Sequence, residues 1–261
     1  MTAGDGMADD IAYRVHGAGP NLLLVSGLNG QGRFWDAVTP SLAERFRVLT
    51  YDQRGCGATP DDGADWSIGS LATDALALAD AMFGAAPFAV IGHSTGGAIA
   101  QHMAATHPDR IRAVGLSGTW MQADAYMHAL FGLRQALLAR APDLDPLLSN
   151  ILRLPPEAFR PPDPHVALDR SVTTRRIDAL IAHRGDRLVG RITAPALVIG
   201  AQDDRIVPPH LSVALHKALA RSTLCMLDEG GHFFVQTQPQ VFAGHVLKWL
   251  TPLLHPPHIN G

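Results

Sequence analysis

Ser94 and His232, with an acidic residue between them in the chain, occur in an order that could activate a hydroxyl group for attack on a carbonyl carbon. A serine hydroxyl is a weak nucleophile at neutral pH. It becomes reactive when a histidine removes its proton and a carboxylate orients that histidine. Chemistry of this kind transfers an acyl group first to the serine and then to water. The local sequence around each residue indicates whether the chain places them for it.

Ser94 lies in Gly92-His93-Ser94-Thr95-Gly96, after the apolar run 88–91 and before a stretch of small residues. The pattern G-x-S-x-G between a strand and a helix predicts a strained turn that exposes the serine hydroxyl. Glycines two residues before and after the serine avoid side-chain collisions there. The following helix would direct its free N–H groups at the reaction centre. The pattern alone also fits a capping serine in a glycine-rich turn; its context favours a nucleophile.

His232 is the candidate base because two glycines precede it, after an apolar run, and a final helix-like segment follows. The acid should follow the preceding strand, where Asp203 and Asp204 are neighbours. Neighbouring side chains diverge, so only one of them can face the histidine. We favour Asp204 and keep Asp203 as the alternative; the other carboxylate would cap a turn or a helix. His93 is expected to pack or hydrogen-bond near Ser94 rather than act as the base.

Acyl transfer also requires hydrogen-bond donors for the developing oxyanion, and each is worth roughly 10²–10³ in rate. The backbone N–H of Thr95, the residue after the candidate nucleophile, is one expected donor. The glycine-rich stretch SGLNGQGRFW at 26–35 should supply the second. We expect it to be the N–H of Leu28.

These residues must be positioned by a fold, and the pattern of apolar residues along the chain predicts alternating strands and helices. Apolar runs without period-2 alternation indicate parallel strands buried on both faces, at 21–27, 47–52, 87–93 and 111–118. Helix-like segments between them lie at 67–84, with Ser70 as the expected N-cap and Gly84 as the stop, and at 96–110. Strand patterns return at 194–204 and 222–232, and helix patterns at 209–220 and 239–254. This order predicts a parallel sheet with helical crossovers.

Residues 120–190 interrupt this pattern with helices and no clear strand. The expected helices lie at 124–141, at 146–154 and around 165–183, with a proline-rich hinge at 154–164. We therefore expect an α/β core made of residues 1–119 and 191–261, with a helical cap at 120–190.

Five motifs, in this order, resemble the α/β-hydrolase superfamily over nearly the whole chain. They are SGLNGQGRFW, YDQRGCG (51–57), GHSTGG (92–97), DDRIVP (203–208) and GGH (230–232). The resemblance implies a mostly parallel, mostly eight-stranded sheet flanked by helices, with a cap inserted after the sixth strand. It implies Ser94 as nucleophile, Asp204 as acid and His232 as base, with Leu28 and Thr95 as oxyanion donors. Asp52, Arg54 and Gly57 would be structural.

The chain departs from the family pattern at two places. Ser26 stands where many relatives have a histidine, and an extra residue separates Gly200 from the acid. Within the superfamily the chain resembles the 3-oxoadipate enol-lactonases and the aminoacrylate hydrolases of pyrimidine breakdown. The segment GTWMQADAY (118–126) leans toward the second group.

We therefore expect hydrolysis of a small carboxylic ester or lactone. Alternatives with the same three residues are cleavage of a C–N or C–C bond, or perhydrolysis; a ligand receptor on this fold is a further alternative. Expected pocket residues are Trp120, the favoured one, with Met121, Tyr126, Phe131 and Phe233, although Phe131 fits core packing equally well. Arg134 could neutralise a substrate carboxylate, but a solvated helical arginine is the simpler expectation.

The composition of the chain limits the classes of molecule that it is expected to bind. The 261 residues are 47% hydrophobic with a net charge of −3, which offers no basic field for nucleic acid or an anionic membrane. Two distant cysteines predict neither a disulfide framework nor a zinc site, and we expect no metal and no organic cofactor. The chain has no apolar run of membrane-spanning length and no signal-peptide pattern at its start. We expect a cytoplasmic monomer or homodimer that acts on a small molecule.

Overall fold

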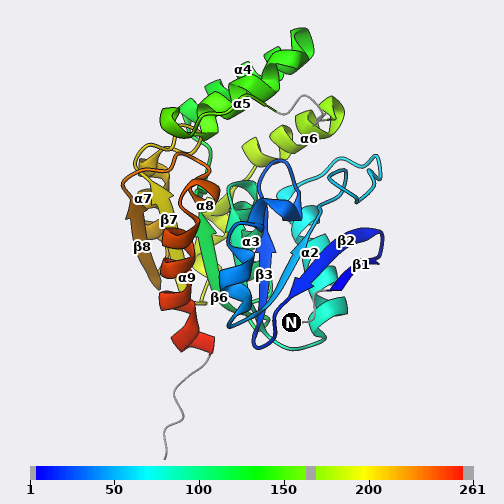
Figure 1. Ribbon diagram of the computed structural model, residues 1–261, viewed down its shortest axis with the longest axis vertical. Helices are drawn as coiled ribbons and strands as arrows, with labels where there is room; N and C mark the ends of the chain where they lie inside the picture. The colour runs from blue at the N-terminus through cyan, green and yellow to red at the C-terminus, as the bar shows by residue number, and fades with distance from the viewer. Residues whose placement is uncertain (1–3, 163–168, 255–261) are drawn as a thin grey trace, which may run out of the picture.

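A central sheet organises the computed structural model, which describes residues 4–162 and 169–254 (Figure 1). Its eight strands lie in the order β1-β2-β4-β3-β5-β6-β7-β8. They are β1 (Gly4–Ala8), β2 (Ile11–His16), β3 (Asn21–Val25), β4 (Arg47–Tyr51), β5 (Phe88–His93), β6 (Ile111–Ser117), β7 (Ala196–Ala201) and β8 (Ser222–Leu227). The six strands from β3 to β8 pair in parallel, which confirms the predicted fold class.

The first two strands form an antiparallel hairpin that the apolar runs did not predict. Strand β1 is a small-residue edge strand and carries little hydrophobic pattern. The hairpin turns through Asp9 and Asp10, both at positive φ (47° and 63°), as a tight two-residue turn requires. Ile11, Tyr13 and Val15 alternate along β2 and pack on the core, and this was the signal that could have revealed the strand.

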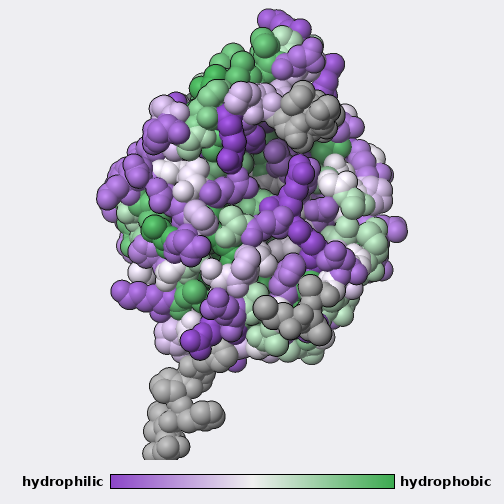
Figure 2. Space-filling model, in the orientation of Figure 1, coloured by the Kyte–Doolittle hydropathy of each residue, from purple (hydrophilic) through white to green (hydrophobic). Residues whose placement is uncertain are grey.

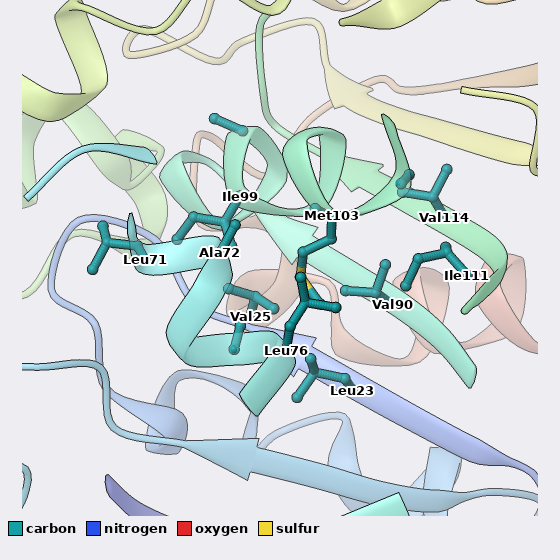
Figure 3. Packing of buried hydrophobic residues seen from close by; sticks show 14 of the residues in the cluster. Leu23, Val25, Leu71, Ala72, Leu76, Val90, Ile99, Met103, Ile111 and Val114 are labelled. Atoms are coloured by element: carbon teal, nitrogen blue, oxygen red, sulfur yellow. The ribbon is translucent and has the colours of Figure 1, made fainter. Parts of the chain in front are cut away.

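Two helical layers bury both faces of the sheet. The helices are α1 (Thr39–Ala43), α2 (Ile68–Phe83), α3 (Thr95–Thr106), α4 (Ala125–Arg140), α5 (Asp145–Arg153), α6 (Arg170–Ile181), α7 (Pro209–Ala218), α8 (Phe234–Thr237) and α9 (Pro239–Leu254). Leu23 and Val25 point into a cluster shared with α2, α3 and α7, as Figure 3 shows in part. Leu22 and Leu24 point the other way, toward α1, α8 and α9. Burial on both faces explains why these strands read as continuous apolar runs.

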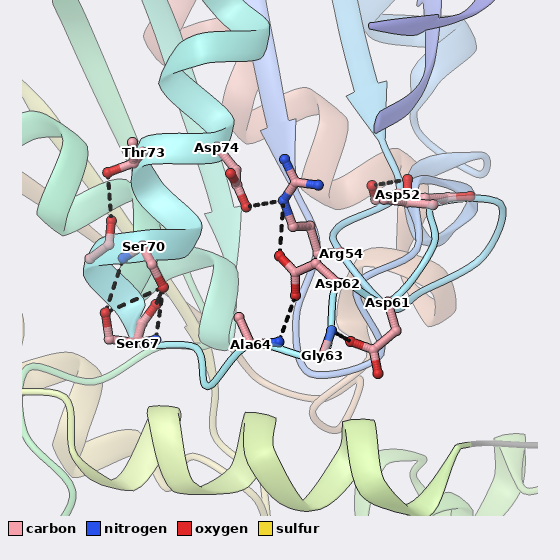
Figure 4. Close-up of polar contacts among 12 residues, drawn as sticks. Asp52, Arg54, Asp61, Asp62, Gly63, Ala64, Ser67, Ser70, Thr73 and Asp74 are labelled. Carbon is pink, nitrogen blue, oxygen red and sulfur yellow. Dashed lines mark hydrogen bonds and ion pairs between the residues drawn. The ribbon is translucent and has the colours of Figure 1, made fainter. Parts of the chain in front are cut away.

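Helix α2 begins at a different serine from the one expected. Ser67, not Ser70, is the N-cap: its hydroxyl accepts from the Ser70 N–H at 3.0 Å, and the Ser70 hydroxyl accepts from the Ser67 N–H at 2.9 Å (Figure 4). This reciprocal capping box satisfies two N–H groups, so both serines serve the start of the helix. The helix ends at Gly84, as predicted, where φ is 60°.

The YDQRGCG turn supports the loop after β3. The Asp52 carboxylate accepts from the N–H groups of Gly32, at 2.8 Å, and Ala58, at 2.9 Å. A Cβ on Gly57 would lie 2.0 Å from that carboxylate. Arg54 pairs with Asp74 of α2 at 3.0 Å and lies 3.6 Å from Asp62 (Figure 4). These contacts are structural.

Helices α4, α5 and α6 lie between β6 and β7 in the chain and gather at one end of the molecule in Figure 1. Trp120, Met127, Phe131, Ile177 and Leu180 form their apolar centre. Apolar side chains also gather on the exposed surface over α4 and α5 in Figure 2; among them are Leu133, Leu144, Leu147 and Ile151. Of the helix predicted around 165–183, residues 165–168 lie outside the described residues. None of the described helices is long and apolar enough to cross a membrane.

Candidate active site

Ser94 stands on a strained turn between β5 and α3. Its backbone has φ 56° and ψ −121°, which is rare for a residue with a side chain. Glycines make room for this turn: a Cβ on Gly92 would lie 2.0 Å from the Gly96 carbonyl oxygen, and one on Gly96 would lie 2.1 Å from that of Val25. The Ser94 N–H donates to the Ser117 carbonyl at 2.8 Å, and the Thr119 hydroxyl donates to the Ser94 carbonyl at 2.8 Å. The turn is therefore held from two sides.

His232 lies against Asp204, which follows β7. The His232 Nδ1 and the Asp204 Oδ2 are 2.7 Å apart, and both side chains are buried. The second oxygen, Oδ1, accepts from the N–H groups of Ile206 and Val207, each at 2.8 Å. Each carboxylate oxygen thus has a fixed donor, and this arrangement orients the imidazole ring.

Asp203 binds the backbone of the turn before His232 and not the imidazole ring. Its carboxylate accepts from the N–H groups of Gly230, at 3.1 Å, and Gly231, at 2.9 Å. Both glycines have positive φ, 128° and 65°, so the turn before His232 depends on them. Asp203 holds the loop that carries the histidine, while Asp204 contacts the histidine itself.

His93 packs beside this pair. Its ring stacks on Phe34 with centroids 4.8 Å apart, and its centroid lies 4.8 Å from that of His232. Its Nδ1 is 3.0 Å from the Ser117 hydroxyl. Burial, with a smaller effect from the charge of His232, holds the pKa of His93 well below its usual value. His93 is therefore a neutral packing residue at neutral pH.

Ser94 and His232 line one cavity of about 420 Å³, together with Leu28 and Thr95. Leu28 follows Gly27, where a Cβ would lie 3.1 Å from the Ser94 Cβ, so glycine lets this loop approach the serine. Thr95 begins α3, and the first N–H groups of a helix have no partner within that helix. Some of the residues between 130 and 162, which belong to α4, α5 and the segment after them, also line the cavity.

The expected aromatic lining is only partly present. Phe233 and Phe131 line the cavity. Trp120 is fully buried in the centre of the inserted helices, and Met121 packs toward the core that contains α3. Tyr126 is 43% exposed and its hydroxyl donates to the Arg205 carbonyl. None of Trp120, Met121 and Tyr126 is among the described residues that line the cavity: the first two pack into apolar clusters after β6, and Tyr126 lies at the surface.

Four arginines give the cavity wall a positive charge; of these, the sequence analysis considered Arg134 alone. Arg33, Arg134, Arg153 and Arg160 line it. Arg134 is buried, not solvated as expected, and pairs with Asp145 through two contacts of 2.7 and 3.0 Å. Arg153 lies over the Phe233 ring, 4.7 Å from its centroid, and donates to Asn150. Burial, strengthened by the nearby Arg134, lowers the pKa of Arg153 to about 10, so it stays charged at neutral pH.

Metal ligands are not grouped in the described chain: no three histidine, cysteine or acidic side chains lie together there in a way that could hold an ion. The groups that the site does bring together are a hydroxyl on a strained turn and an imidazole bonded to its carboxylate. Together they suit attack on a carbonyl carbon.

Comparison with known proteins agrees with this architecture. The sequence model of the alpha/beta hydrolase family matches residues 15–245. A protein of Agrobacterium fabrum, named as the carbamate hydrolase RutD, is 33% identical over 259 residues, covering 92% of this chain and 98% of that protein. The crystal structure of a hydrolase from Pseudomonas aeruginosa PA01 superposes with a TM-score of 0.83 and 27% identity, covering 95% of this chain and 98% of that one.

The enol-lactonase of Burkholderia xenovorans LB400 superposes with a TM-score of 0.81 over 95% of this chain and 100% of that one. Its identity is 22%, so that likeness concerns the fold alone. The resemblance that the sequence motifs predicted is confirmed by these matches. The chain belongs to the α/β hydrolase family.

Proposed function

We propose that this protein is a serine hydrolase in which Ser94 is the nucleophile, His232 the general base and acid, and Asp204 the acid that orients the imidazole. One observation carries the proposal: a serine on a strained strand-to-helix turn and a histidine bonded at 2.7 Å to a buried aspartate line the same cavity. A capping serine in an ordinary turn would need neither the strain nor the histidine.

The steps follow from the roles of these groups. His232 takes the Ser94 proton at Nε2, since Nδ1 is committed to Asp204, and the serine oxygen attacks the substrate carbonyl carbon. The N–H groups of Leu28 and Thr95 stabilise the resulting oxyanion. His232 then protonates the leaving atom, and the bond to that atom breaks. Water, deprotonated by His232, attacks the acyl-enzyme, and Ser94 regains its proton as the acid is released.

The cavity wall supports a substrate that carries a negative group. Four arginines line the wall. Among the described residues only Arg134 of these four is paired with a carboxylate, so Arg33, Arg153 and Arg160 remain to attract an anion. The cavity volume of about 420 Å³ lies within the usual range of small-molecule sites, roughly 300–1,000 Å³. We propose that α4, α5 and α6 act as a cap over this cavity, and that the end of α5 and the segment after it present Arg153 and Arg160 to the substrate.

The scissile bond is then a C–O or C–N bond beside a carbonyl group. The name of the Agrobacterium fabrum relative, a carbamate hydrolase, supports a C–N bond. The resemblance of the sequence motifs to the 3-oxoadipate enol-lactonases supports an ester or lactone. The three catalytic groups perform both reactions by the same steps, and the leaving atom differs.

A substrate panel and one variant test the proposal. Wild-type protein is assayed on p-nitrophenyl esters, lactones and carbamates of short acids, each in a neutral and a carboxylate-bearing form. We expect turnover, with a higher kcat/KM for the charged form, and covalent labelling by a fluorophosphonate.

Ser94→Ala should lose both turnover and labelling. Ser149→Ala should keep labelling, because Ser149 is a second buried serine of the same cavity but lies within α5 rather than on a strained turn. Hydrolysis that persists in Ser94→Ala would contradict the serine mechanism. Equal kcat/KM for neutral and charged substrates would contradict the anionic substrate.

A further inference from the structure

Arg176 of α6 is a buried cation at the back of the loop that carries Leu28. Only 1% of the residue is exposed, and it ranks among the largest fully buried side chains. Its Nε donates to the Leu28 carbonyl at 2.7 Å and its Nη2 donates to the Gln53 side-chain oxygen. Both acceptors are uncharged, and Nη1 has no hydrogen-bond partner in the part of the chain that the structure describes. Burying a guanidinium with so little compensation is costly.

The contacts of Arg176 converge on one short loop. Gln53, which accepts from Arg176, also bonds to this loop. Its Nε2 donates to the Ser26 carbonyl at 2.7 Å, and its backbone N–H donates to the Gly30 carbonyl at 2.8 Å. Gly30 has φ 64°, and a Cβ there would lie 3.2 Å from the Arg176 Nη2, so the loop backbone packs directly on the guanidinium. The loop of residues 26–30 is thus held by hydrogen bonds to three of its carbonyl groups, those of Ser26, Leu28 and Gly30.

We infer that Arg176 is a positioning residue for the oxyanion hole: it holds the Leu28 carbonyl, in the peptide group next to the one that carries the Leu28 N–H, and it couples α6 to that loop. The inference rests on the proposed function, in which the Leu28 N–H stabilises the oxyanion. Arg176 is not among the described residues that line the cavity, so it acts through Leu28 rather than on the substrate. Its positive charge behind the loop also favours the negative charge that develops in front of it.

Arg175 provides a matched control on the same helix. It donates to Asp61 and to the Ala64 carbonyl, and its guanidinium lies 4.2 Å from the centroid of the Trp66 ring. Figure 4 shows the loop that carries Asp61 and Ala64 beside a helix with the colour of α6 in Figure 1. Arg175 therefore also ties α6 to the core, but at a loop away from Leu28.

The experiment compares Arg176→Met, Arg176→Lys and Arg175→Met with wild type. The readouts are kcat and KM on the best ester, the rate of fluorophosphonate labelling and the affinity for a boronic acid that forms a tetrahedral adduct. Arg176→Met should lower kcat, labelling rate and boronate affinity together by about 10²-fold, as expected for a displaced oxyanion donor, with KM changing less than about 3-fold. Arg176→Lys should recover part of this loss, because an ammonium keeps the charge but not the forked geometry.

Arg175→Met should leave all these quantities within about 3-fold of wild type. If Arg176→Met does not fold, Gln53→Met, which breaks the same connection with an uncharged residue, decides by the same readouts. A kcat within about 3-fold of wild type in the folded variant, or an equal loss in Arg175→Met, overturns the inference. Absence of labelling in the wild-type protein instead overturns the proposed function, and the inference falls with it.

Discussion

Asp203 and Asp204 are chemically identical neighbours whose backbone directs them to different tasks. Asp204 contacts the imidazole, and Asp203 accepts from the backbone N–H groups of Gly230 and Gly231, in the turn before His232. Asp204→Asn should lower kcat on the order of 10⁴-fold, because an amide at this position favours the wrong tautomer of His232. Asp203→Asn should lower kcat far less and reduce the free energy of unfolding by about 1–3 kcal/mol, since hydrogen bonds to a charged acceptor are weakened.

Steady-state kinetics and urea unfolding of both variants separate the two effects. Equal losses of kcat, or a larger loss for Asp203→Asn, would contradict the assignment of Asp204 as the acid.

At the same scale, the sequence limits the site to a few residues but does not give side-chain directions. The chain order placed an acid at 203 or 204, and the turn geometry alone decides which of them meets His232. Trp120 shows the same limit. An aromatic residue after a strand end can enter a pocket or the core, and the path of the backbone after Gly118, at φ 49°, sends it to the core. Arg176 could not be assigned because its partners are 148 and 123 residues away.

Among the elements, the turn between β5 and α3 requires the absence of side chains. A Cβ at Gly96 would meet the carbonyl oxygens of Val25 at 2.1 Å and Ser26 at 2.6 Å, and neither can move without shifting β3 and the loop after it. Gly96→Ala should therefore lower the free energy of unfolding by at least about 1–3 kcal/mol, the usual cost of overpacking. It should also lower kcat, because β3 leads into the loop with Leu28.

Gly132→Ala is the control, because Gly132 lies in α4 and a Cβ added there would have no atom within 4 Å. There alanine should raise the free energy of unfolding by about 0.5–1 kcal/mol through better helix propensity. Urea unfolding of both variants measures the difference. A neutral Gly96→Ala would show that the turn tolerates a side chain and that the packing argument is incorrect.

Prediction of strands from the sequence succeeded where the strand itself is rich in apolar residues. Strands β3 to β7 are buried along nearly their whole length, and β8, although it is a partly exposed edge strand, keeps an apolar composition. Strand β1 lies at the sheet edge and is largely exposed, which removes that signal. The arrangement of α4, α5 and α6 depends on contacts such as the buried Arg134–Asp145 pair, between residues on two different helices. No local pattern encodes such a pair.

At the scale of the whole molecule, buried histidines make stability depend on pH. His183 is 4% exposed, and burial, with a further contribution from His102 and against the opposing effect of Asp186, lowers its pKa to about 4. Burial also lowers the pKa of His93. In the unfolded chain a histidine titrates near pH 6.5. As pH falls from there, the unfolded state binds protons that the folded state does not, so the free energy of unfolding falls with it.

The stabilising contribution of His183 is complete above about pH 6.5 and is lost as the pH falls toward about 4, where the loss reaches roughly 3 kcal/mol. His183→Gln removes this titration, so its free energy of unfolding should fall less steeply than that of wild type between those two pH values. The exposed His128 is the control, and His128→Gln should keep the wild-type slope. Urea unfolding at intervals across the range measures the slopes directly. If His183→Gln and wild type lose stability at the same rate, His183 is charged in the folded protein and the acid sensitivity has another source.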